Sequence, residues 1–359
     1  MARALVLLNL GTPDSTDVKD VRDYLHEFLS DPRVLDMNPI GRFLLLHLVI
    51  LRKRPAESAE AYRKVWTERG SPLLFNGLDL VEKVQELVGG DTPVELAMRY
   101  KNPSIRSVLE GLHRRGVDDL VLFPLFPQYS SAAWGSGVEK FLEEAGRLWD
   151  EPSIRVIPPY YDHPAFIEPF CEVAGPVLED LEPDKVLMSF HGIPQRHVRT
   201  VFDGRPEREL LGTDGAGAGH CLEKPDCCAE ICTANRNCYS AHCYATARAL
   251  AEKLELGPDR WELSFQSRLG RDPWLVPYTD VRIEELPGEG VEKLAVFSPA
   301  FTADCLETVE EIGIRAREDF LAAGGKELRL IPSLNSEPAW AEGVLRIVAD
   351  HVAADQAGD

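Results

Sequence analysis

Residues 121–130 read VLFPLFPQYS, and residues 295–304, which lie 174 positions further along the chain, read AVFSPAFTAD. The same offset joins RVIPPYYDHPAF at 155–166 to RLIPSLNSEPAW at 329–340. Self-similarity at a fixed offset is typical of a repeated structural unit. The sequence therefore predicts two similar halves with a boundary near residue 170.

Eight short apolar runs rich in Val, Leu, Ile and Phe are predicted to be buried strands. They lie at 4–11, 93–100, 119–128, 154–160, 185–192, 261–268, 293–301 and 327–334. Amphipathic helical stretches separate most of them, and strands that alternate with helices form parallel sheets covered on both faces. We therefore expect an α/β fold with halves 1–170 and 171–359, and a ligand cleft at the carboxyl ends of the strands.

Composition limits the partners and the compartment. The 359 residues carry a net charge of -20, which repels nucleic acid and favours cationic substrates such as metal ions. The apolar run at the N-terminus is too short for a signal peptide or a membrane span. We expect a cytoplasmic protein, and disulfides are rare in that compartment.

Two motifs at strand ends could carry chemistry. In SFHGIPQR, His191 directly follows a predicted strand, where it could accept a proton or contact a metal ion. In FTADCLETVEEI, a helix that begins near Thr302 would place Asp304, Glu307 and Glu311 on one face. The alternatives are a histidine bonded to backbone and acids that merely complement the helix dipole.

Further polar and aromatic residues follow other predicted strands. Arg99 and Tyr100 end one strand, Ser130 follows another, and Trp274 lies in a proline-rich loop after a third. Arginine and tyrosine on a cleft wall could hold a carboxylate and an aromatic ring. The alternatives are a surface arginine and ordinary packing.

One apolar segment ends in a basic cluster. Residues Phe43 to Leu51 are apolar except for His47, and Arg52, Lys53 and Arg54 follow them. The segment is too short to cross a bilayer. It could be a buried core helix, or an element that dips into an anionic membrane surface.

Seven motifs in order along nearly the whole chain together resemble the ferrochelatase family. They are LNLGTP, GSPLL, MRYKNP, FPQYSS, SFHGIPQR, FQSRLGRDPWLVPYTD and FTADCLETVEEI. The resemblance implies the chelatase fold of two Rossmann-like halves, with parallel four-stranded sheets flanked by helices. It also implies a lyase that inserts Fe(II) into protoporphyrin IX to form protohaem, in the last step of haem biosynthesis.

The resemblance assigns roles residue by residue. His191 is similar to the family's active-site histidine and Glu307 to its partner carboxylate, and both would contact the substrate iron. Asp304 and Glu311 correspond to neighbouring acids on a metal path or proton relay. The porphyrin pocket would be lined by Leu10, Arg99, Tyr100, Ser130 and Trp274.

The apolar segment Phe43 to Leu51 is similar to the family's membrane-facing lip. This implies a protein peripherally associated with the inner face of the membrane. The sequence leaves open whether the protein forms an oligomer. The motif LNLGTP, together with the long lip, resembles the protoporphyrin branch rather than the coproporphyrin branch. A chelatase for cobalt or nickel would share the fold, and a non-catalytic haem or metal carrier could use the same cleft for binding.

Six of the eight cysteines lie within a predicted insertion at 212–243. Some ferrochelatases carry a [2Fe-2S] cluster, and such a cluster needs four thiolates. The candidates are Cys221, Cys227, Cys228, Cys232, Cys238 and Cys243. The cluster would be non-catalytic, because neither metal insertion nor proton removal needs an electron. A structural zinc site that uses His220 or His242 is the alternative.

Overall fold

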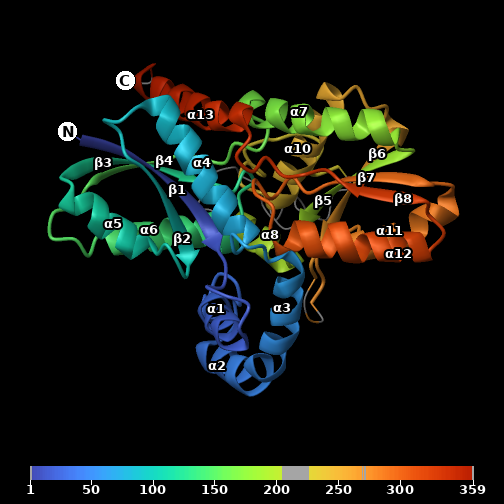
Figure 1. Ribbon diagram of the computed structural model, residues 1–359, viewed down its shortest axis with the longest axis horizontal. Helices are drawn as coiled ribbons and strands as arrows, with labels where there is room; N and C mark the ends of the chain where they lie inside the picture. The colour runs from blue at the N-terminus through green and yellow to red at the C-terminus, as the bar shows by residue number, and fades with distance from the viewer. Residues whose placement is uncertain (1, 204–225, 269, 271, 358–359) are drawn as a thin grey trace.

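The computed structural model describes residues 2–203, 226–268, 270 and 272–357, and it contains two four-stranded parallel sheets (Figure 1). The strands of the first sheet are β1 (Ala2–Gly11), β2 (Val94–Tyr100), β3 (Val117–Pro124) and β4 (Ser153–Val156). Those of the second are β5 (Lys185–His191), β6 (Trp261–Gln266), β7 (Lys293–Phe297) and β8 (Glu327–Leu330). The orders are β2-β1-β3-β4 and β6-β5-β7-β8.

The two orders are the same when each strand is matched to its counterpart in the other half. The repeated sequence at 121–130 begins within β3, and its counterpart at 295–304 begins within β7. The second repeated pair begins in β4 and β8. The predicted α/β architecture of two similar halves is therefore confirmed.

Helices cover the sheets and join their strands. Before β5 the described helices are α1 (Val18–Ser30), α2 (Pro39–Leu45), η1 (Leu46–Ile50), α3 (Leu51–Val65), α4 (Pro72–Val88), α5 (Ile105–Arg114), η2 (Ser131–Gly135), α6 (Ser136–Ala145) and α7 (Pro164–Leu181). After β5 the described helices are α8 (Gln195–Asp203), α10 (Tyr239–Lys253), η3 (Pro258–Arg260), α11 (Thr279–Glu285), η4 (Leu286–Glu289), η5 (Leu306–Ala316), α12 (Arg317–Ala322) and α13 (Pro338–Ala357). The elements η1, η2 and η5 are π-helices.

The last helix reaches back across the molecule. Helix α13 packs on α4 and α7, and α7 packs on α10 and β7 (Figure 1). The buried side chains of these elements form one core cluster that includes Phe166 and Trp340. Residue 170, the predicted boundary, lies inside α7, and the domain division stays a prediction.

Several strands end earlier than the apolar pattern predicts, and proline is the reason. β3 ends at Pro124, β4 ends two residues before Pro158, and β7 ends two residues before Pro299. Proline has no N–H to donate to a neighbouring strand, so pairing stops where it occurs. The following residues form the loops at the carboxyl edge of each sheet.

One predicted helix start is wrong. The helical element after β7 begins at Leu306 rather than near Thr302, and Cys305 is its N-cap residue. The Thr308 hydroxyl lies within hydrogen-bonding distance of the Cys305 amide, which fixes the start. Asp304 therefore precedes the helix instead of lying on its face with Glu307 and Glu311.

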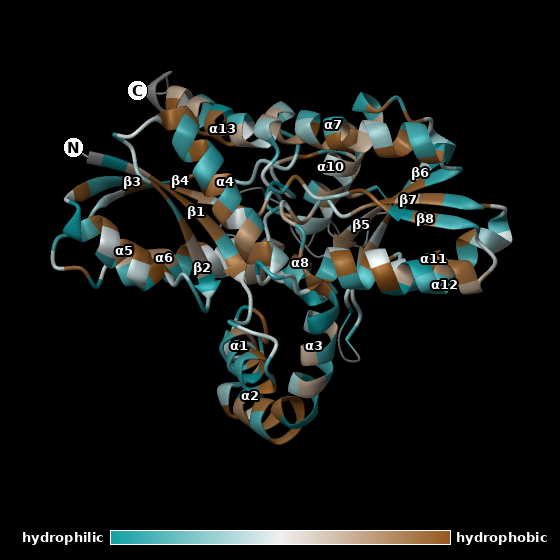
Figure 2. Ribbon diagram, viewed as in Figure 1, coloured by the Kyte–Doolittle hydropathy of each residue, from teal (hydrophilic) through white to brown (hydrophobic). Residues whose placement is uncertain are grey.

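Elements α1, α2, η1 and the start of α3 project from the body of the molecule (Figure 1). Apolar residues gather at the tip of this projection, and Ile40 and Phe43 are 71% and 60% exposed (Figure 2). Leu46 and Leu51 instead face inward and are 2% exposed. Full burial of the Phe43 to Leu51 segment as a core helix is therefore ruled out. Among the described residues, no helix combines the length and apolarity needed to span a bilayer.

Candidate active site

His191 is the last residue of β5, at the carboxyl edge of the second sheet. Its Nδ1 lies 2.6 Å from the carbonyl oxygen of Gly192. A carbonyl oxygen only accepts, so Nδ1 carries a proton, and in the neutral ring the lone pair is on Nε2. The His191 carbonyl accepts from the Tyr239 hydroxyl at 2.8 Å, which fixes the backbone below the ring.

Gly192 allows the loop to pass close to β6. A Cβ at this position would lie 2.8 Å from the Gln266 carbonyl oxygen and 3.2 Å from Cε3 of Trp274. The Gly192 amide donates to that same carbonyl at 2.7 Å. The half-buried Trp274 ring is thereby held beside the residue that follows His191.

Gln266 links the histidine strand to the acidic helix. It pairs in register with His191 across β5 and β6, and its Nε2 donates to the Glu307 carbonyl at 2.8 Å. Its Oε1 accepts from the Ser189 hydroxyl at 2.7 Å, so both ends of this buried amide are bonded. Sequence reasoning missed Gln266, because only its position at the strand end distinguishes it.

The three predicted acids occupy different environments. Asp304 accepts from the Thr308 hydroxyl at 3.0 Å and from Asn335 Nδ2 at 2.8 Å, and it ties the loop after β7 to the loop after β8. Glu311 accepts from the amide of Ser267 at 3.0 Å and from its hydroxyl. Glu307 is half-buried near Cys305, whose thiol pKa is raised by burial and by the Glu307 charge.

Two buried tyrosines, Tyr24 on α1 and Tyr62 on α3, are influenced by the charge of Glu307. Burial raises the pKa of Tyr24, and the Glu307 charge raises it further. Burial is also the largest cause of the raised pKa of Tyr62, followed by the charges of Tyr24 and Glu307. The Tyr62 and Tyr24 rings pack edge-to-face, with their centroids 6.4 Å apart. Both are aromatic residues at helical spacings typical of a core, so the sequence gives no signal of this placement.

Arg99 and Tyr100 meet at a buried carboxylate that sequence reasoning also missed. Arg99 Nη2 and the Tyr100 hydroxyl donate to Asp31 Oδ2 at 2.6 and 2.9 Å. Ser136 donates to the same oxygen, and Arg99 Nε donates to Ser136 at 2.7 Å. Tyr100 is 0% exposed, and burial raises its pKa above the usual range, as does the Asp31 charge.

The other predicted pocket residues lie on the first sheet and its loops. Leu10 is half-buried near the end of β1 and packs against the cluster that contains Tyr24 and Tyr100. Ser130 is the N-cap residue of η2, and its hydroxyl accepts from the Ala133 amide at 3.1 Å. Both positions are at the carboxyl edge of the sheet.

The described cysteines of the 212–243 segment lie before α10 and in its first turns. Cys238 is the N-cap residue of this helix, and a hydrogen bond with Cys238 raises the pKa of the Cys228 thiol, as does burial. The sulfur atoms of Cys227 and Cys228 are 3.7 Å apart. Cys243 is buried in the first turns of α10, and Cys232 is exposed.

Cys228 thus contacts both Cys227 and Cys238. In residues 226–268 and the rest of the described chain, no three His, Cys, Asp or Glu side chains are grouped to hold a metal ion. Cys221 and His220 lie outside the described residues. His242 Nε2 lies 2.8 Å from the Arg236 carbonyl, and Nδ1 accepts from the Tyr129 amide at 3.1 Å. Both ring nitrogens are thus engaged, which weakens the zinc alternative at His242.

Comparison with known proteins adds to this geometry. The family model described as Ferrochelatase matches residues 2–352. The chain belongs to the ferrochelatase family. A protein named ferrochelatase from Pseudomonas fluorescens is 46% identical over 347 residues, which cover 95% of this chain and 96% of the relative. One from Legionella pneumophila is 41% identical over 352 residues, 98% of this chain and 100% of the relative.

Solved structures share the fold of this family member at low sequence identity. SirB from Bacillus subtilis with Fe3+ has a TM-score of 0.51 and 12% identity, over 99% of this chain and 98% of SirB. A sirohydrochlorin chelatase SirB in complex with cobalt also has a TM-score of 0.51, with 10% identity, over 98% of this chain and 95% of that chain. The predicted chelatase fold is confirmed.

Proposed function

We propose that the protein inserts Fe(II) into protoporphyrin IX to form protohaem, as a lyase in the last step of haem biosynthesis. Membership of the ferrochelatase family supports the reaction class. The observation that carries the proposed mechanism is the hydrogen bond from His191 Nδ1 to the Gly192 carbonyl. In the neutral ring this bond places the lone pair on Nε2, at the edge of the sheet where ligands bind in α/β folds.

The reaction exchanges two pyrrole protons for one divalent cation. His191 Nε2 accepts a pyrrole proton, and the Glu307 carboxylate stabilises the imidazolium or takes the proton onward. The macrocycle must bend to expose its nitrogen lone pairs, and a tight pocket supplies that strain from binding energy. The Gln266 bridge holds the two residues on adjoining elements, which supports their joint action.

Asp304 and Glu311 are proposed as a metal path or proton relay. Carboxylate oxygens suit a hard divalent cation. Glu311 is oriented by both donors of Ser267, and Asp304 by the hydroxyl of Thr308. These bonds leave each carboxylate with remaining lone pairs, because an ionised carboxylate offers about four acceptor sites.

Leu10, Ser130 and Trp274 are proposed to line the porphyrin pocket, with Arg99 and Tyr100 behind them. Leu10 and Trp274 offer apolar surface from the first and second halves respectively. The Arg99 guanidinium lies 4.4 Å from the Tyr100 ring centroid and pairs with Asp31, so the two residues form one rigid wall.

A direct assay tests this function. Purified protein is incubated anaerobically with protoporphyrin IX and Fe(II), and in parallel with Zn(II), while the metalloporphyrin spectrum is followed. Rapid metalation is expected. Preference for coproporphyrin, or for cobalt or nickel with another tetrapyrrole, would favour a chelatase of that specificity. Tight binding of haem without metalation would indicate a carrier.

We also propose that the protein is cytoplasmic and peripherally associated with the inner face of the membrane. The exposed apolar tip of the projection supports this, together with the exposed cations Arg52, Lys53 and Arg54 directly after it. Clustered cations beside an apolar surface favour anionic lipid. The lip would let a poorly soluble porphyrin pass between bilayer and pocket.

Finally, we propose a non-catalytic [2Fe-2S] cluster held by four of Cys221, Cys227, Cys228, Cys232, Cys238 and Cys243. The Cys227–Cys228 and Cys228–Cys238 contacts support a shared sulfur neighbourhood at the start of α10. The described residues by themselves do not form a complete metal site. The cluster would support folding or regulation.

A further inference from the structure

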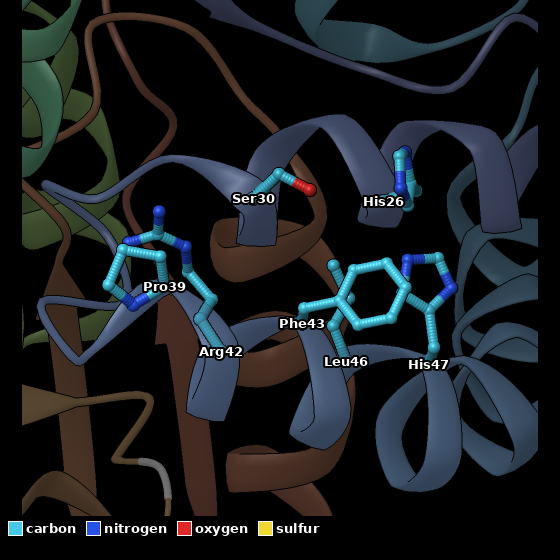
Figure 3. A pocket seen from close by; sticks show the side chains of 7 residues that line it. All are labelled: His26, Ser30, Pro39, Arg42, Phe43, Leu46 and His47. Carbon is cyan, nitrogen blue, oxygen red and sulfur yellow. The ribbon is translucent and has the colours of Figure 1, made fainter.

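A pocket of about 230 Å³ lies in the projecting unit, between α1 and the α2–η1 segment (Figure 3). Helix α1 contributes His26 and Ser30. The segment below it contributes Pro39, Arg42, Phe43, Leu46 and His47. The pocket thus combines apolar walls with side chains that can donate hydrogen bonds.

Arg42 is fixed in the pocket with most of its donors unused. Its Nη1 donates to the Leu35 carbonyl at 3.2 Å. No other acceptor within the described part of the chain bonds this guanidinium. A guanidinium presents five N–H donors in a planar fork, which suits the oxygens of a phosphate.

Two histidines line the other end of the same pocket, and the Phe43 side chain lies between His47 and Arg42 (Figure 3). The rings of His26 and His47 are 5.2 Å apart, and the Phe43 ring lies 4.4 Å from the His47 ring. Neither imidazole hydrogen-bonds another residue in the described ranges. Glu27, the acid next to His26, accepts from the Lys101 amide at 3.2 Å, so its carboxylate is already engaged.

The pocket lies in a part of the molecule where exposed apolar residues and cations occur together. Phe43 lines the pocket and is exposed, Ile40 and Leu44 on the same helix α2 are exposed as well, and the cations Arg52 to Arg54 follow η1 along the chain. The protein as a whole has a net charge of -20, so this concentration of cations at an apolar tip is local. An anionic group at the depth of a lipid headgroup would complement both features.

We propose that this pocket binds the phosphate of an anionic phospholipid, with Arg42 as its principal donor, while Ser30, His26 and His47 line the rest of the pocket around the headgroup. The proposal rests on the membrane association proposed above. It adds to that association a specific headgroup site at the lip.

Cosedimentation of the full chain with vesicles tests the site. The vesicles contain phosphatidylglycerol and phosphatidylcholine, and the key variant is Arg42→Gln. Arg52→Gln is the matched control, because it removes the same charge from the same lip without lining the pocket. One cation near an anionic surface contributes about a fivefold gain in partitioning, and salt screens that gain at an exposed residue.

We expect Arg42→Gln to lower vesicle binding by more than about tenfold, because charge-assisted hydrogen bonds are roughly twice as strong as neutral ones. This loss of binding should persist at high salt. Equal losses for the two variants at both salt concentrations would overturn the headgroup site. The double variant Leu44→Glu/Val49→Glu tests docking separately. If this double variant binds vesicles as well as the wild type, membrane docking by the lip is rejected, independently of the result for Arg42→Gln.

Histidine side-chain NMR provides a readout without a membrane. Short-chain phosphatidylglycerol below its micelle concentration should shift the ring signals of His26 and His47 in the wild type but not in Arg42→Gln. Absence of the shift in the wild type would refute the site. Inorganic phosphate that binds with equal affinity would make it a general anion site and reject the lipid assignment.

Discussion

His191 donates from Nδ1 to the carbonyl oxygen of Gly192, the next residue along the chain, at 2.6 Å. This bond sets the tautomer of the ring, because a carbonyl has no proton to give. The nitrogen that faces away from the backbone is therefore the basic one. Gly192 is required for this loop conformation, since any Cβ would meet the Gln266 carbonyl.

Replacement of this base should stop metal insertion and leave the fold intact. His191→Ala is expected to lower the rate by about 100-fold or more, as for loss of a positioned general base. Glu307→Gln should have a smaller effect, because it changes the partner and not the base. His113→Ala, at an exposed histidine on α5, is the control. Near-normal turnover of His191→Ala in the metalloporphyrin assay would reject the mechanism.

Asp304 should contribute to stability as well as to the site. Asp304→Ala removes the acceptor for Thr308 and Asn335, and it should lower the free energy of unfolding by about 2 kcal/mol. Urea denaturation followed by circular dichroism measures the loss. Glu284→Ala, at an exposed carboxylate on α11, is the control. Equal stability of the two variants would show that the Asp304 bonds carry no net stabilisation.

Asp31 should make stability depend on pH in the acid range. Burial alone would raise the pKa of the Asp31 carboxyl, but the hydrogen bonds that it accepts, from Ser136 first, and the Arg99 charge outweigh burial and lower it. The stabilisation is present above the unfolded pKa of about 4, and it is lost as pH falls through the lower folded pKa.

We therefore expect Asp31→Asn to cost about 3 kcal/mol at neutral pH, because it leaves Arg99 without its buried counter-charge. The difference from the wild type should shrink below about pH 4. Melting temperatures measured from neutral to acid pH check this expectation. A difference that stays constant over the range would contradict the assigned ionisation.

The lip should respond in opposite ways to charge at exposed and buried positions. Leu44 and Val49 are 47% and 57% exposed, whereas Leu46 is 2% exposed. Leu44→Glu/Val49→Glu should weaken vesicle binding and change stability by less than about 0.5 kcal/mol per site. Leu46→Glu should instead lower the melting temperature, because a buried charge costs several kcal/mol. A large fall in melting temperature for the exposed pair would argue against a surface lip.

The cysteine segment should give the purified protein a colour. We expect anaerobic preparations to be red-brown, with about two irons and two labile sulfides per chain. Cys228→Ser or Cys238→Ser should bleach the protein, while Cys171→Ser, outside the segment, should not. Colourless protein with stoichiometric zinc after growth in iron-replete cells would refute the cluster.

Much of the architecture follows from local sequence. Repeated apolar runs and the fixed offset between them predict two parallel sheets, because buried strands are read from short apolar segments and duplication from self-similarity. The position of His191 is predictable in the same way, since a polar residue directly after a buried strand must lie at the sheet edge. Helix α5 begins directly after Ser104, because the Ser104 hydroxyl accepts a hydrogen bond from the Ser107 amide and so caps the helix.

Tertiary structure decided what the local pattern could not. Asp31 contacts Arg99 across 68 positions of sequence, and Gln266 reaches Glu307 across 41, so no local pattern joins either pair. Leu44 and Leu46 are identical side chains two positions apart, and only packing against α1 and α3 buries one and exposes the other. Hydrophobicity drives apolar residues together without direction, whereas hydrogen bonds and close packing depend on the exact neighbours that the fold supplies.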